Sequence, residues 1–130
     1  MSEDIAETVR KIVAESLGKK LEEVRLDSIL MEDLGAESLD FLDIVFRLER
    51  DFGIEITRGE MERASRGDMT ADEFAPNGVI SEAGLARLRE LMPEAKDRIK
   101  PGLRPSTILT LFSVQTFANM VIGKREGRTV

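Results

Sequence analysis

The stretch LGAESLDFLDIVFRLERDFGIEI, residues 34–56, decides how this chain is interpreted. It predicts a short loop and then a helix from Ser38 to Gly53, because apolar residues recur at helical spacing and a glycine follows them. Ile54 and Ile56 then alternate as short extended anchors. A serine at the start of a helix can accept a hydrogen bond from one of the first unpaired backbone amides. Ser38 is therefore either a simple capping residue or a residue with a further use.

The rest of the chain predicts an all-α fold, a small bundle of three main helices plus short ones. Further helices are expected at about residues 2–17, ended by Gly18; at 81–92, opened by Ser81 and closed by Pro93; and at 113–123, opened by Ser113. In the helix after Ser38, the apolar stripe is expected to consist of Leu42, Val45, Leu48 and Phe52. Residues 19–37 and 57–79 are expected to be largely connections, the latter with a turn at Pro76, Asn77 and Gly78. Helices this short are marginal alone, so their apolar stripes must pack together as a small helical bundle.

Composition limits the possible functions. The chain has 130 residues, the size of one domain, and it contains no Cys and no His, which disfavours disulfides, metal binding and triad-type catalysis. Residues 1–56 hold 15 acidic residues against 7 basic ones, whereas residues 57–130 hold 10 against 12. The acidic half would repel nucleic acid and attract a basic protein. No apolar run is long enough to cross a membrane and the first residues are unlike a signal peptide, so a cytoplasmic protein, with a monomer expected, is predicted.

The residues around the serine resemble the acyl carrier protein signature. The run DLGAESLD, residues 33–40, is similar to the family pattern in which a serine follows Leu-Gly-Ala-Asp and precedes Leu-Asp, and the likeness continues through residue 56. Asp27 and Ser28 upstream, and SVQTF at 113–117, also look like family positions. The resemblance covers about residues 2–56 and 106–123. It implies a small acyl-carrier-like helical bundle with an inserted loop and helix.

The resemblance also implies a cofactor. Ser38 would carry 4′-phosphopantetheine, transferred from coenzyme A as a phosphodiester, with Glu37 and Leu39 beside it. A phosphodiester at a helix N-terminus meets free amides and the positive end of the helix dipole. The cofactor's thiol would then hold an acyl group, so the chain itself needs no catalytic residue. A Ser38 that only caps is disfavoured, because a capping box would require Glu or Gln where Phe41 stands.

The same resemblance implies partner enzymes. They are a phosphopantetheinyl transferase, an acyl-(acyl carrier protein) synthetase or ketosynthase, and acyltransferases with basic docking patches. The residues expected to meet partners are Asp40, Phe41, Asp43, Phe46, Arg47 and Glu49, with Leu39 supplying further apolar contact. Arg47 departs from the commoner family pattern. Phe41 also departs from it, and this residue either lines the cofactor's path, touches a partner or packs in the interior.

The larger departure is length, because residues 57–112 stand where typical members have a short loop with one brief helix. Loops of this length are usually functional or disordered. The chain is expected to be one carrier domain, 1–130, with an insertion that widens or covers the acyl-binding region or docks a dedicated partner. A surface decoration is the alternative. For the whole protein, a carrier in lipid or secondary-metabolite biosynthesis is favoured, and the alternatives are a peptidyl or aryl carrier and an unloaded interaction or regulatory module.

Overall fold

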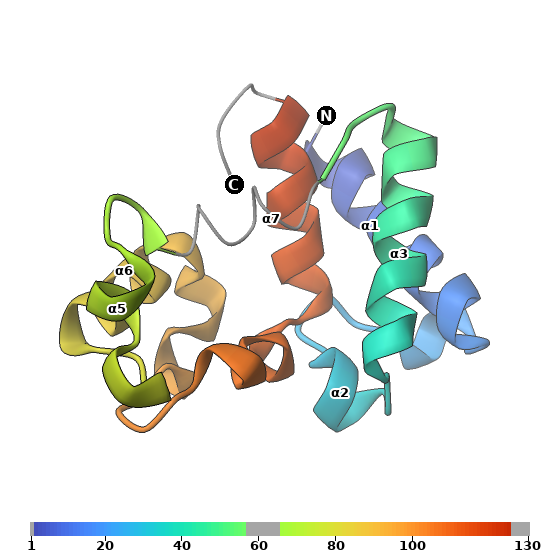
Figure 1. Ribbon diagram of the computed structural model, residues 1–130. Coiled ribbons are helices and arrows are strands. Elements are labelled where there is room, and N and C mark those ends of the chain that lie inside the picture. Colours follow the sequence, from blue (N-terminus) through green and yellow to red (C-terminus); the bar gives the residue numbers. More distant parts are fainter. Residues whose placement is uncertain (1, 57–65, 126–130) are drawn as a thin grey trace.

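The computed structural model describes residues 2–56 and 66–125, and this part of the chain is helical with no β-strand (Figure 1). The all-α prediction is confirmed. The elements are α1 (Ser2–Leu17), η1 (Leu21–Glu23), α2 (Leu30–Asp33), α3 (Ser38–Phe52), α5 (Ala71–Phe74), η2 (Pro76–Gly78), α6 (Glu82–Leu91), η3 (Pro93–Arg98), η4 (Pro105–Leu111) and α7 (Val114–Arg125). Elements named η are 3₁₀-helices.

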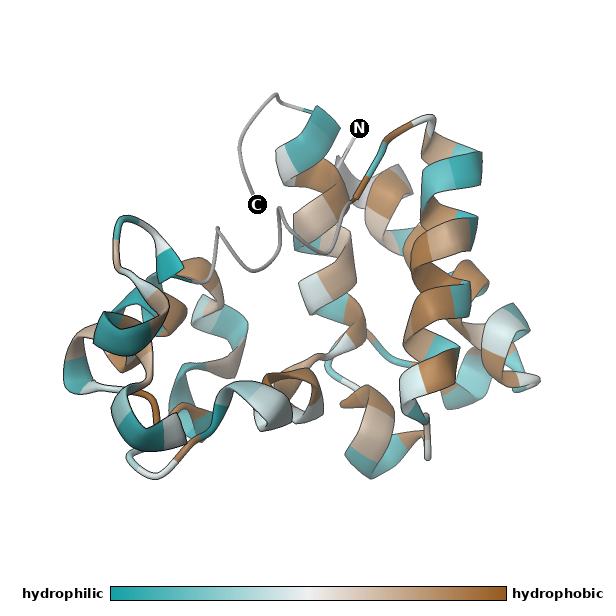
Figure 2. Cartoon of the chain, in the orientation of Figure 1, coloured by the Kyte–Doolittle hydropathy of each residue, from teal (hydrophilic) through white to brown (hydrophobic). Residues whose placement is uncertain are grey.

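The three longest helices form a bundle in which α1 lies against both α3 and α7 (Figure 1). Hydrophobic and hydrophilic residues alternate along α1 and α3, as expected for amphipathic helices (Figure 2). The residues that meet inside the bundle include Val9, Val13, Ile44, Leu48, Phe117 and Val121, all fully buried. Burying one such side chain contributes about 1.5–3 kcal/mol, which is why helices that are marginal alone become stable together.

The predicted helix ends are confirmed at four positions. Gly18 and Gly53 follow α1 and α3 with φ of +67° and +63°, a left-handed conformation that glycine adopts at little cost. The hydroxyl of Ser81 accepts the Gly84 N–H at 3.1 Å and opens α6. The hydroxyl of Ser113 accepts the Thr116 N–H at 3.3 Å at the start of α7. Local capping chemistry therefore sets these boundaries.

The segment before α3 is bonded to the segment before α7. The Leu30 N–H donates to the Phe112 carbonyl at 3.0 Å, and the Val114 N–H donates to the Ser28 carbonyl at 3.0 Å. Ile29 and Ser113 pair as an isolated antiparallel bridge. The connection over residues 19–37 is thus held against the bundle by backbone hydrogen bonds, and this fixes the position from which α3 begins.

Residues 66–104, here called the α5–α6 lobe, form a second cluster of helices that stands apart from α1 and α3 (Figure 1). The lobe has its own buried residues, namely Phe74, Ile80, Leu85, Leu88, Met92, Ala95 and Ile99. The predicted turn at residues 76–78 is confirmed, with Asn77 and Gly78 at φ of 59° and 79°. The prediction of loop failed at α5, and over 57–65 it concerns residues outside those described.

The α5–α6 lobe is attached to the bundle by polar contacts near the start of α7. One carboxylate oxygen of Glu94 accepts the Thr116 hydroxyl at 2.8 Å, and the other accepts the Asn119 side-chain amide at 3.1 Å. The Arg98 guanidinium donates to the Leu111 carbonyl at 2.7 Å. These bonds fix η3 against η4 and α7.

Candidate functional site

The loop that leads into α3 is anchored on both sides of its turn. Leu34 and Ala36 are buried, and the Ala36 N–H donates to the Leu30 carbonyl at 2.9 Å. Gly35 between them has φ of +70°, which a side chain would strain. The residue that follows this loop is therefore held in a defined place.

Ser38 is exposed and is the first residue of α3. The N-cap is Glu37, whose N–H donates to the Asp40 carboxylate at 2.7 Å. Within residues 2–56 and 66–125 the Ser38 hydroxyl has no hydrogen-bond partner. A purely capping Ser38 is thus contradicted, because Glu37 holds the capping position and the serine side chain is free.

The start of α3 fits a phosphate group. The first amides of a helix have no intrahelical partner, and the dipole of this 15-residue helix places partial positive charge there. Two carboxylates, Glu37 and Asp40, lie beside Ser38 and oppose that effect. Asp40 is held by the Glu37 N–H, and Glu37 is exposed to water, which screens its charge.

Three large hydrophobic side chains on α3 face solvent, and among the described residues no other large hydrophobic is so exposed. They are Leu39, Leu42 and Phe46, at 74%, 68% and 65% exposure, here called the α3 stripe. Their spacing places them on one face of the helix, beginning next to Ser38. The prediction that Leu42 belongs to the inward stripe is wrong, because Phe41, Ile44 and Leu48 occupy that face instead.

Charged side chains beside the α3 stripe are engaged with their neighbours. The Asp43 carboxylate accepts from the Ser16 hydroxyl at 2.5 Å and from Arg47 at 2.8 Å, and these bonds lower the pKa of Asp43. Arg47 also lies 3.6 Å from Glu15 of α1. Glu49 accepts the Ile56 N–H at 2.8 Å and so holds the chain after Gly53. Part of the expected partner face therefore also joins α3 to the rest of the bundle.

Phe41 does not lie on that face. It is only 4% exposed, and its ring centroid lies 5.9 Å from that of Phe112 and 5.9 Å from that of Phe117. The assignment of Phe41 to a partner surface is therefore corrected to a packed interior residue. Its burial follows from position, since it lies on the inward face with Ile44.

A family match covers the region that contains this candidate site. A family model described as a phosphopantetheine attachment site matches residues 7–71, which is half of the chain. The chain belongs to this family. As in acyl carrier proteins, its cofactor is 4′-phosphopantetheine, bound covalently, and such carrier domains are not themselves catalysts. No solved structure matches the carrier.

Two further findings describe the carrier. None of its described helices is long and apolar enough to span a bilayer. Among the described residues no group of three or more acidic side chains is arranged to hold a metal ion. The match ends at residue 71, before most of the α5–α6 lobe and all of α7.

Proposed function

We propose that this protein is a cytoplasmic acyl carrier protein that bears 4′-phosphopantetheine on Ser38 and passes acyl thioesters between enzymes of a lipid or secondary-metabolite pathway. The proposal treats residues 1–130 as one carrier domain in which residues 57–112 are an insertion. The observation that carries it is the free, exposed hydroxyl of Ser38 at the start of α3, inside the matched region.

The other described serines of the matched region are less suited to attachment. Ser28 is 7% exposed and its hydroxyl accepts the Arg25 N–H at 3.0 Å. Ser16 donates to Asp43 and is half-buried. Ser65 lies outside the described residues. Accessibility to a second enzyme therefore favours Ser38.

The attachment step needs little from this chain. The Ser38 oxygen forms an ester bond to the phosphate next to pantetheine, the pyrophosphate bond of coenzyme A breaks, and adenosine 3′,5′-bisphosphate leaves. The serine proton passes to a base of the transferase, because no His or Cys is present here. Once attached, the cofactor supplies the thiol that holds the acyl group. Leu39 and Glu37 flank the bond.

Partner enzymes would dock on the α3 stripe, which supplies apolar contact, while the acidic residues around it favour basic patches. The carboxylates nearest Ser38 are Glu37 and Asp40, and both lie on the surface or near it. Rim charges of this kind raise association rates more than they raise affinity, and they lose effect in salt. That suits a carrier that must leave each enzyme quickly.

The test is loading by a phosphopantetheinyl transferase with coenzyme A, followed by intact mass. The wild type should gain one phosphopantetheine, Ser38→Ala should gain none, and Ser106→Ala, which alters another exposed serine, should behave as wild type. A time course should slow as salt is raised. Loading of Ser38→Ala would show that the attachment site is another residue.

A folded wild type that gains nothing and stays bound to one partner would favour the unloaded module. Loading followed by aminoacylation or arylation would favour the peptidyl or aryl carrier.

A further inference from the structure

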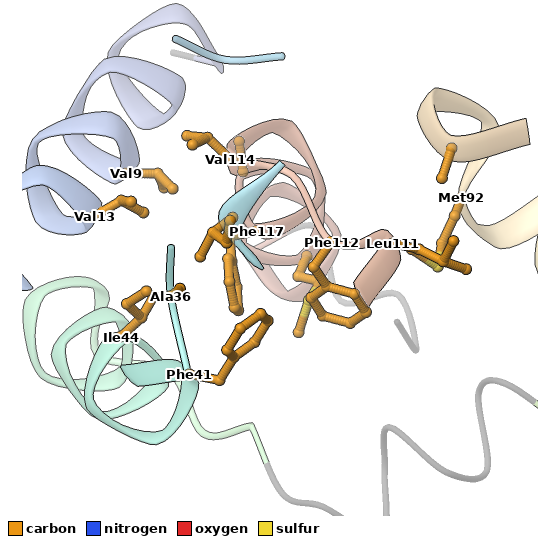
Figure 3. Packing of buried hydrophobic residues seen from close by; sticks show 14 of the residues in the cluster. Val9, Val13, Ala36, Phe41, Ile44, Met92, Leu111, Phe112, Val114 and Phe117 are labelled. Carbon is orange, nitrogen blue, oxygen red and sulfur yellow. The ribbon is translucent and has the colours of Figure 1, made fainter. Parts of the chain in front are cut away.

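Three phenylalanine rings fill the interior behind the start of α3 (Figure 3). Besides the two contacts of Phe41, the rings of Phe112 and Phe117 lie 5.5 Å apart at 73°, an edge-to-face arrangement. Exposure of the three is 4%, 6% and 0%. We call Phe41, Phe112 and Phe117 the aromatic cluster. Edge-to-face and tilted ring pairs at these distances are favourable beyond the area that they bury.

The aromatic cluster lies directly inside the attachment end of α3. Phe41 is three residues after Ser38, so the buried ring lies one helical turn from the exposed serine. The family resemblance does not account for Phe41, because typical members have a small or polar residue there. A bulky ring is thus placed where the cofactor arm begins.

The second ring comes from the end of the proposed insertion. Phe112 is held in place because its carbonyl accepts the Leu30 N–H at 3.0 Å and its N–H donates to Leu109 at 3.1 Å. The preceding residue, Leu111, is fixed by Arg98 of the α5–α6 lobe, and Figure 3 shows Leu111 between Phe112 and Met92. All of these apolar residues belong to one hydrophobic cluster. The lobe therefore supports the wall against which Phe41 packs.

An acyl chain on a flexible arm will enter an apolar interior if space allows, because removing methylene groups from water is favourable. Protein interiors are close-packed, so entry past Phe41 requires a ring to move. Phe41 has Phe112 on one side and Phe117 on another. Phe112 is held by its backbone hydrogen bonds, and Phe117 is fully buried in the bundle. The aromatic cluster thus opposes entry from the Ser38 end.

We propose that Phe41, supported by Phe112 and Phe117, is a specificity-determining residue that keeps the acyl chain outside the bundle. The cargo class that follows is short or polar acyl groups, which need no enclosure by the carrier. This inference rests on the proposed function, because it concerns the group carried on Ser38.

The test uses the full chain loaded on Ser38 with non-hydrolysable alkyl-pantetheine thioethers of short, medium and long chain. The melting temperature of the wild type should not change with chain length. Phe41→Ala should melt lower with the short chain and recover by several degrees as the chain lengthens and fills the vacated space. Phe41→Leu should show a smaller recovery, and it carries the test if Phe41→Ala does not fold. Leu91→Ala, altered at a half-buried position of α6, should remain independent of length.

Recovery with chain length separates a specificity role from a structural one, since lost packing alone would lower every melting temperature equally. A wild type that is stabilised by longer chains as strongly as Phe41→Ala would overturn the proposal, and so would length-independent melting in both Phe41 variants. Intact mass records loading in each sample. A wild type that gains no mass disproves the proposed function itself, whereas loaded samples that fail the length test disprove only the role of Phe41.

Discussion

The bundle and the α5–α6 lobe are both built from short helices, but they are held together in different ways. The bundle depends on long-range packing, with α1 between α3 and α7 and the aromatic cluster joining residues far apart in the chain. The lobe depends on neighbours in sequence, since α5, η2, α6 and η3 follow one another and share one set of buried residues. The family match falls mainly on the bundle. We therefore expect the carrier function to belong to the bundle, whose packing is non-local. The lobe is expected to be a locally folded addition.

The largest expected effects come from emptying each core in turn. Phe117 and Leu88 are both fully buried, and truncation to Ala should cost about 3–5 kcal/mol for Phe117 and about 2–5 kcal/mol for Leu88. Phe117→Ala should raise hydrogen exchange in α1, α3 and α7. Leu88→Ala should raise exchange in α6 and η3 and leave α1 and α3 protected, because α6 packs mainly on η3 and α5. Exchange followed by mass spectrometry measures both.

Leu91→Ala is a matched control, because Leu91 lies on the same helix and is only half-buried. It should cost less than Leu88→Ala. If Leu88→Ala instead released exchange evenly across α1, α3 and α6, the two regions would be one cooperative unit and the contrast between them would be lost.

A smaller effect is expected inside the lobe at Gly84. Glycine to alanine in a helix usually stabilises by about 0.5–1 kcal/mol. Here a Cβ would lie 2.7 Å from the Ile80 side chain and 2.9 Å from the Phe74 carbonyl, and the latter cannot move without disturbing the Ser81 N–H bonded to it. The clash should win, so Gly84→Ala should lower the unfolding free energy of the lobe by about 1–3 kcal/mol.

The exposed position Ala86 on the same helix provides the control, since Ala86→Gly should cost only the helix propensity of about 1 kcal/mol. Urea unfolding of the two variants and the wild type gives the comparison. A Gly84→Ala variant more stable than wild type would mean that α6 can shift away from Phe74, and that the lobe is less tightly packed than these distances indicate.

Local chemistry explains which parts of the fold the sequence predicted. The C-terminal ends of α1 and α3, at Gly18 and Gly53, and the starts of α6 and α7, at Ser81 and Ser113, depend on a glycine or serine and were predicted. The predicted end of the last helix at residue 123 was wrong, because α7 continues to Arg125. The short helix α5 was missed, although Thr70 and Glu73 form the reciprocal bonds of a capping box at 3.1 and 2.9 Å. The capping-box pattern is present in the sequence TADE, residues 70–73, but the charged residues around it led to the prediction of a loop.

The faces of α3 could not be predicted from spacing. Leu42, Val45 and Leu48 follow helical spacing, and so do Phe41, Ile44 and Leu48. Which of these two sets of side chains faces the interior depends on the residues of α1 and α7 that pack against α3. The sequence pattern of α3 does not contain this information. For the same reason the contact of Phe41 with Phe112 could not be predicted, since it joins α3 to the far end of the proposed insertion. Ser38 could be proposed as the attachment residue without either kind of information, because it follows a loop whose sequence resembles the family pattern.

The smallest effect concerns the hydrogen bonds of Asp43, which join α1 to α3 in the bundle. Hydrogen bonds from Ser16 and then from Arg47 lower the pKa of Asp43 below its ordinary value of 3.8. A carboxyl whose folded pKa is depressed contributes stability above the unfolded value and loses it as pH falls through the folded value. Asp43→Asn should therefore be slightly less stable than wild type at neutral pH. The difference should shrink as pH falls below 3.8 and vanish only below the lowered pKa of the folded state. Urea unfolding midpoints across this pH range measure the difference in stability.

In a Ser16→Ala background, which lacks the first hydrogen-bond donor, the stability difference that Asp43→Asn makes should be smaller at neutral pH. Parallel pH profiles in all variants would mean that packing alone joins α1 to α3, and that Asp43 remains available to partners.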